Sequence, residues 1–163
     1  MEYVLFFRIV FAHVVISFVS NRIPYRHLEK VRKHLQVCEA EIRFYERSCH
    51  IKKWKDLVPS AGPFDKRSLK DDSLEYLSVF ILETVRAEVA HVSCIIASMM
   101  ILLSSPLGVS PEMALFFLII NLPCIMIQRY NRPRLERILR RKGGNITVPE
   151  FELRDMELLR KKD

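Results

Sequence analysis

Two uncharged, strongly apolar stretches, residues 92–103 and 113–127, dominate the second half of this chain. A segment with two prolines and a glycine, residues 104–111, separates them and predicts a turn. A helix that is apolar on every side must be buried in protein or in lipid. Each stretch is shorter than the roughly 20 residues of a full span, but polar flanking side chains can reach the interface. The pattern therefore predicts a helical hairpin in a membrane.

Basic segments flank this hairpin and give the chain a net charge of +7. Residues 22–70 and 129–142 are dense in Lys and Arg, whereas the turn at 104–111 has none. Because Lys and Arg are enriched on the inner side of membrane proteins, we expect both basic segments to face the cytoplasm of a cell membrane. Such a charge also suits nucleic acid, but the apolar stretches favour membrane lipids as the partner, and we expect no nucleic acid.

The first 20 residues predict a further apolar helix. Residues 3–19 are nearly all apolar, which is just long enough to cross a bilayer. Arg8 and His13 interrupt the stretch, at a cost if they lie at mid-depth. The chain begins Met1-Glu2 and lacks the basic start of a signal peptide. We interpret residues 1–20 as a retained anchor, which could cross the membrane or lie along its surface.

A basic amphipathic pattern follows within residues 21–72. Apolar residues recur there at steps of three and four, at Leu28, Val31, Leu35, Cys38, Ile42 and Tyr45. One such stripe on a basic helix can lie on an anionic membrane surface or pack on a partner helix. Two prolines and a glycine then predict a loop over residues 57–72.

Residues 73–132 are expected to form the membrane unit. The spacing of Asp72 and Glu75 predicts a helix start, and no proline interrupts the following 31 or so residues before Pro106. The second leg should end near residue 127. Residues 133–163 then predict a basic cytoplasmic tail, with a short helix beginning after Pro133 and a last polar helix beginning near Thr147. The fold class is therefore an all-α membrane protein.

The long helix carries a cluster of ionisable residues where it enters the membrane: Glu83, Arg86, Glu88 and His91. Such groups are expensive at a lipid boundary and usually face one another or a wet cavity. Glu88 lies three residues before His91, so its carboxylate could orient the imidazole as a general base, and Glu83 could pair likewise with Arg86. The alternative is a polar collar of a membrane helix. A single Glu-x-x-His motif does not make a metal site, so we expect no metal.

A second polar cluster ends the second leg, with Asn121, Gln128, Arg129, Asn131 and Arg132. Arginine there can hold a phosphate or carboxylate through two hydrogen bonds. The alternative is a positive-inside stop signal. A closed hairpin would bring this cluster level with the Glu83–His91 cluster. Trp54 and Lys55 belong to a third basic patch, for which interfacial anchoring is the default reading.

Three stretches, residues 51–56, 83–91 and 121–135, together resemble the glycosyl-4,4'-diaponeurosporenoate acyltransferases of carotenoid biosynthesis. The run Gln128 to Leu135 is the most specific of them. The resemblance implies a membrane enzyme that esterifies a sugar hydroxyl of a glycosylated carotenoid, or of a related membrane glycolipid, with a fatty acyl group. It implies a lipid-soluble acceptor and an acyl donor as co-substrate, no separate cofactor, and leaves association with other pathway enzymes open. The shared residues map to Trp54, Lys55, Glu83, Arg86, Glu88, His91, Gln128, Arg129, Asn131 and Arg132.

The resulting hypothesis is an acyltransferase in which His91, oriented by Glu88, deprotonates a sugar hydroxyl. Arg86, Arg129 and Arg132 would bind the phosphate of the donor or stabilise the developing oxyanion. Glu83 is a further catalytic candidate, and the further substrate-binding candidates are Trp54, Lys55, Asn121, Gln128 and Asn131. The alternative is a non-catalytic membrane anchor or assembly factor whose basic faces recruit a partner enzyme.

Overall fold

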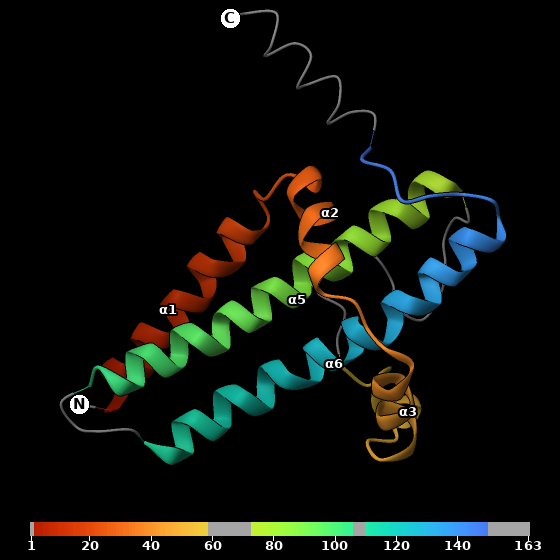
Figure 1. Ribbon diagram of the computed structural model, residues 1–163. Coiled ribbons are helices and arrows are strands. Elements are labelled where there is room, and N and C mark those ends of the chain that lie inside the picture. The colour runs from red at the N-terminus through yellow and green to blue at the C-terminus, as the bar shows by residue number, and fades with distance from the viewer. Residues whose placement is uncertain (1, 59–72, 106–109, 150–163) are drawn as a thin grey trace, which may run out of the picture.

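The computed structural model describes residues 2–58, 73–105 and 110–149, and every regular element in these ranges is a helix. The long helix α5 lies between α1 and α6, and the short helix α2 packs across it (Figure 1). The all-α prediction is confirmed. The elements are α1 (Glu2–Ser20), α2 (Tyr25–His34), α3 (Glu39–Arg47), α4 (Ile51–Trp54), α5 (Leu74–Leu103) and α6 (Pro111–Arg141).

Helices α1, α5 and α6 are each long and apolar enough to cross a membrane. Leu5 and Ile9 of α1 pack against Leu102 of α5 and Phe117 of α6, while Ser20 lies at the level of Arg86. Helix α1 therefore runs antiparallel to α5, with its N-terminal end beside the end of α5 that leads to the hairpin turn. The start of α1 therefore lies level with the hairpin turn, whereas its end at Ser20 lies beside the middle of α5, at Arg86.

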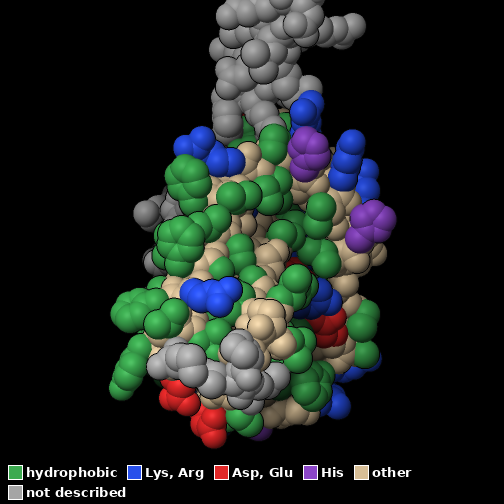
Figure 2. Space-filling view, turned by 90° about the vertical axis from the view of Figure 1, so that its left-hand side faces the viewer, with side chains coloured by type: hydrophobic (Ala, Val, Ile, Leu, Met, Phe, Trp, Pro, Cys, Tyr) green, Lys and Arg blue, Asp and Glu red, His purple; other side chains and the backbone are tan. Residues whose placement is uncertain are grey.

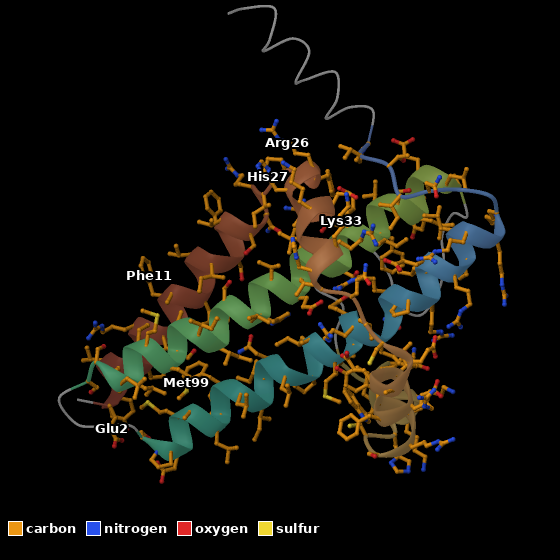
Figure 3. All side chains as sticks on the ribbon, in the orientation of Figure 1. Glu2, Phe11, Arg26, His27, Lys33 and Met99 are labelled. Atoms are coloured by element: carbon orange, nitrogen blue, oxygen red, sulfur yellow. The ribbon has the colours of Figure 1, made fainter. Side chains whose placement is uncertain are left out.

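The outer surface of these helices is apolar, as a surface in contact with lipid would be. Phe11 projects from α1 away from α5 (Figure 3). Hydrophobic side chains cover much of this side of the molecule, and Lys, Arg and His side chains gather toward its upper end (Figure 2). An exposed apolar surface this extensive is rare in soluble monomers and marks an interaction site. It suggests association with a membrane. Large exposed apolar residues include Tyr3, Phe7, Phe11, Val14, Phe18, Ile96, Met100, Leu115, Ile119 and Leu122.

Helix α5 begins at Leu74 and runs for 30 residues, as a single long helix was predicted to do. Its N-terminal cap is Ser73, whose side-chain oxygen accepts a hydrogen bond from the backbone N–H of Tyr76. This bond satisfies one of the amides that the first turn leaves unpaired. The predicted cap residue, Asp72, lies outside the described residues.

Helix α6 is one helix of 31 residues that continues through Pro123 and Pro133. The prediction of a separate helix after Pro133 was wrong. A proline removes one hydrogen bond from a helix and normally bends or ends it. Here the turns beyond Pro133 are held by packing, because Leu135 and Leu139 lie in one buried cluster with Leu77 and Ile81 of α5.

The prediction of a single helix for the apolar stripe from Leu28 to Tyr45 was also wrong, because α2 ends at His34 and α3 begins only at Glu39. The two halves of the apolar stripe have different partners. Leu28 packs with Leu82 and Val85 of α5, whereas Tyr45 packs with Ile127 and Tyr130 of α6. The break lets one stripe cover two helices, so α2 uses its apolar face within the protein.

Most of the predicted loop at 57–72, the middle of the turn at 104–111, and the predicted last helix from Glu150 onward lie outside the described residues.

Candidate functional site

The centre of the candidate site is the Glu88 carboxylate, which is held by two arginines of α6. Arg129 Nη1 donates to Glu88 Oε1 at 2.7 Å, and Arg132 Nη2 donates to Glu88 Oε2. Glu88 is only 2% exposed, and a buried carboxylate is tolerated only when charged partners satisfy its oxygens. These bonds confirm the predicted juxtaposition of the two polar clusters.

Arg129 extends the network to α3 through Glu41. Arg129 Nη2 donates to Glu41 Oε2 at 2.7 Å, and Arg129 Nε donates to Glu41 Oε1. The hydroxyl of Tyr45, one turn along α3, donates to the same Oε1. The arginine hydrogen bond holds the pKa of Glu41 below its ordinary value, with partial burial opposing it. Burial and the Glu41 carboxylate raise the pKa of Tyr45 to about 12.

Glu41 is a member of the network that the sequence pattern did not single out. It is one of several acidic residues on a charged helix, and nothing in its spacing distinguishes it from Glu39. Only the packing of α3 on α6 makes it a partner of Arg129.

The side chain of Arg132 is buried, and its guanidinium donates hydrogen bonds to α5 and to the end of α2. It is 2% exposed. Its Nη1 donates to the backbone oxygen of Leu35 at 2.8 Å, and its Nε donates to Thr84 Oγ1 at 3.0 Å. Arg132 thus ties the end of α2 to the α5–α6 pair. These contacts give it a positioning role and leave no face of the guanidinium for a substrate.

Arg86 performs a similar task at the end of α1. Its Nη1 donates to the backbone oxygens of Ser20 and Ile23, both at 2.7 Å. Its Nε donates to Glu83 Oε1 at 3.0 Å, which confirms the predicted pairing of these two residues. Arg86 is 7% exposed. It therefore binds the carbonyl of Ser20 at the end of α1 and that of Ile23 in the turn that follows.

His91 lies one turn beyond Glu88 and contacts α6 instead of Glu88. Its Nδ1 is 2.9 Å from Asn121 Oδ1, and Asn121 Nδ2 donates to the backbone oxygen of Phe117 at 2.8 Å. The predicted pairing of Glu88 with His91 was wrong. A buried carboxylate gains more from two guanidinium groups than from one imidazole, so Arg129 and Arg132 take both of its oxygens.

A second histidine approaches the same face of α5 from α1. His13 Nε2 is 2.8 Å from Ser98 Oγ and 3.2 Å from the backbone oxygen of Cys94. The sequence pattern indicated only that His13 interrupts an apolar stretch. In the fold it forms a polar contact that holds α1 against α5.

Gln128 and Asn131 are half-buried on α6 beside the network, and neither has a hydrogen-bond partner within the described part of the chain. Trp54 lies on the short helix α4, and no hydrogen bond or ring contact joins it to His91 in the described ranges. Its Nε1 donates to the backbone oxygen of Cys49 at 2.8 Å, and its ring packs with Ile127 and Tyr130. Lys55 pairs with Asp56 at 2.7 Å. Over residues 2–58, 73–105 and 110–149, no three His, Cys, Asp or Glu side chains gather to hold a metal ion.

Comparison with known proteins identifies related chains. The model of the glycosyl-4,4'-diaponeurosporenoate acyltransferase family matches residues 24–141. A protein of that name from Staphylococcus aureus (strain MRSA252) is 30% identical over 140 residues, which cover 78% of this chain and 83% of that protein. Its namesake from strain Newman is 33% identical over 109 residues, or 62% of this chain and 66% of that protein. No solved structure matches the chain.

Proposed function

The chain belongs to the glycosyl-4,4'-diaponeurosporenoate acyltransferase family, and from this we propose that it transfers a fatty acyl group to a sugar hydroxyl of a glycosylated carotenoid in a membrane. The matched residues, 24–141, contain every side chain of the Glu88 network and His91. The activity class is that of an acyltransferase. The observation that carries the proposed site is the closed network that brings the polar residues of α5 and α6 to one level beside His91.

The position of this network suits a reaction between lipid-soluble molecules. Apolar surfaces of α1, α5 and α6 lie on one side of it, and the charged helices α2 and α3 lie on the other. A carotenoid and an acyl chain would both partition into lipid, while the sugar and the activated carbonyl would stay at the polar boundary. We place α2 and the end of α6 on the cytoplasmic side, because both are rich in Lys and Arg.

His91 is the general base of the proposed reaction. It accepts the proton of the sugar hydroxyl while the hydroxyl oxygen attacks the acyl carbonyl. A new ester C–O bond forms, the bond between the acyl carbon and its carrier breaks, and the proton passes to the departing carrier. No further reactant is needed, because the acyl donor supplies the activated carbonyl.

Arg129 is the arginine best placed to stabilise the oxyanion of this reaction. A guanidinium has five N–H bonds, and Glu41 and Glu88 take three of those of Arg129. The remaining two point from a side chain that is partly exposed. Gln128 and Asn131 lie within three residues on the same helix and offer amide groups for the sugar. Arg86, Arg132 and Glu83 hold the helices in position, and Glu88 holds Arg129.

The proposal is tested by comparing pigments and lipids of cells with and without this gene by mass spectrometry. Loss of an acyltransferase leaves a glycosylated species that is lighter by one acyl chain, with earlier intermediates unchanged. A membrane anchor for other enzymes would instead lower the whole pathway, and that result would overturn the proposal.

A further inference from the structure

Asn121 is a buried polar residue in the apolar part of α6. It is 2% exposed and stands between Ile120 and Leu122. Its side chain makes two hydrogen bonds, to the Phe117 backbone and to His91. Burying an amide in apolar surroundings is unfavourable unless its polar atoms are paired.

The hydrogen-bond partners of the Asn121 amide show which of its two terminal atoms is the nitrogen and which is the oxygen. The partner at 2.8 Å on one side is the backbone oxygen of Phe117, which can only accept a hydrogen bond. The group facing it must therefore be the donor Nδ2, because an amide oxygen has no proton to give. The amide oxygen Oδ1 is then left to face His91 Nδ1, at 2.9 Å.

This orientation determines the state of the imidazole. Because Oδ1 can only accept, Nδ1 of His91 must carry the proton of that hydrogen bond. In a neutral ring the other nitrogen, Nε2, then holds the lone pair. Asn121 is the one hydrogen-bond partner of the His91 ring in the part of the chain that the structure describes.

We propose that Asn121 is a positioning residue that holds His91 as the Nδ1–H tautomer and leaves Nε2 as the proton acceptor. The catalytic importance of this tautomer rests on the proposed function, in which His91 is the base. The tautomer itself does not depend on that function. Asn121 thus takes the place that the sequence pattern had given to Glu88.

A neutral partner suits this task better than a carboxylate would. An unpaired carboxylate next to His91 would favour the charged imidazolium, which cannot accept a proton. Glu88, one turn away on α5, is paired with both Arg129 and Arg132. An amide can orient the ring without adding charge to an apolar part of the helix pair.

The test is ¹⁵N NMR of the full-length chain with labelled histidine, reconstituted in lipid nanodiscs. The His91 signals are assigned by their loss in His91→Gln. We expect Nδ1 to be protonated and Nε2 to be unprotonated in the native chain. A His91 ring protonated at Nε2 would overturn the inference, and this measurement needs no folded Asn121 variant.

Two variants extend the test. Asn121→Ala should lose the fixed Nδ1–H state, while Asn131→Ala, which removes an amide with no protein partner in the described residues, should keep it. An unchanged His91 spectrum in Asn121→Ala would contradict the proposed role of Asn121. A misplacement of about 1 Å at a reacting group can cost about 100-fold in rate, so kcat should fall by up to about that factor with KM little changed. If the tautomer is lost but kcat is unchanged, the orientation by Asn121 stands and His91 is not the base.

Discussion

Glu88 of α5 and Arg132 of α6 form an ion pair in which each residue is only 2% exposed. The two residues are 44 positions apart in the sequence, so the bond closes the hairpin at the level of the candidate site. Arg132 also binds the oxygen of Leu35, and Arg129 carries the network on to Glu41. One buried carboxylate therefore connects the α5–α6 hairpin to both α2 and α3.

Breaking this pair from one side should destabilise the protein severely. Removing one partner of a buried ion pair leaves an uncompensated charge and typically costs about 3–5 kcal/mol. Arg132→Met should therefore lower the midpoint of thermal unfolding in detergent far more than Arg137→Met, whose pair with Glu39 is at the surface and is expected to contribute no more than about 1 kcal/mol. Equal shifts in the two variants would contradict the structural role of Arg132.

Arg86→Gln should loosen α1 from the rest of the protein, because Arg86 binds the carbonyl oxygens of Ser20 and Ile23. A hydrogen bond to a charged group contributes about 1.5–3 kcal/mol. We expect faster hydrogen exchange across residues 20–25 in this variant. Arg22→Gln is the matched control, since Arg22 lies over the ring of Phe18 at the surface. The assignment of Arg86 fails if both variants exchange at the native rate.

Acid should release α3 from α6 through Glu41. The pKa of Glu41 is lowered in the fold, chiefly by Arg129, so the stability that this contact adds is present above the ordinary glutamate value. It is lost as the pH falls through the lowered folded value. Trp54, the one tryptophan of the chain, packs in the same cluster as Tyr45, so its fluorescence reports the contact.

Glu41→Gln should show the acid-state fluorescence at neutral pH and lose part of the acid transition. Glu46 also contributes to the acid transition, because hydrogen bonds from Lys52 and Tyr130 lower its pKa. The variant Glu46→Gln removes that contribution and so separates it from the contribution of Glu41. Native-like fluorescence and an unaltered acid transition in Glu41→Gln would show that Glu41 does not hold α3 in place.

Much of this architecture follows from apolar patterning, but the pairing of the charges does not. The apolar runs after His91 and after Glu112 predict the hairpin, and a closed hairpin brings the Glu83–His91 cluster to the arginines. Glu41 meets Arg129 only because α3 packs on α6, and α3 is placed by the break after His34. The break occurs because the first half of the apolar stripe packs on α5 and the second half packs on α6. Helical periodicity in the sequence does not reveal that the two halves have different partners. Continuation through Pro133 likewise depends on packing against α5.

Gln128→Ala should weaken substrate binding without lowering thermal stability, because Gln128 has no hydrogen-bond partner within the described ranges. Loss of one hydrogen bond to a sugar would cost about 1 kcal/mol and raise KM several-fold, with kcat nearly unchanged. Steady-state kinetics on reconstituted protein measures both constants. An unaltered KM would exclude Gln128 from the sugar site.

The most direct test of the catalytic assignment is the acyl-transfer activity of His91→Ala, measured by mass spectrometry of the product in membranes that contain equal amounts of inserted protein. General-base catalysis contributes about 10²- to 10⁴-fold, so the acylated product should fall by at least the lower of these factors while the glycosylated precursor accumulates. His27→Ala, which changes an exposed histidine of α2 (Figure 3), should retain full activity. Undiminished acylated product from His91→Ala would show that His91 is not the base.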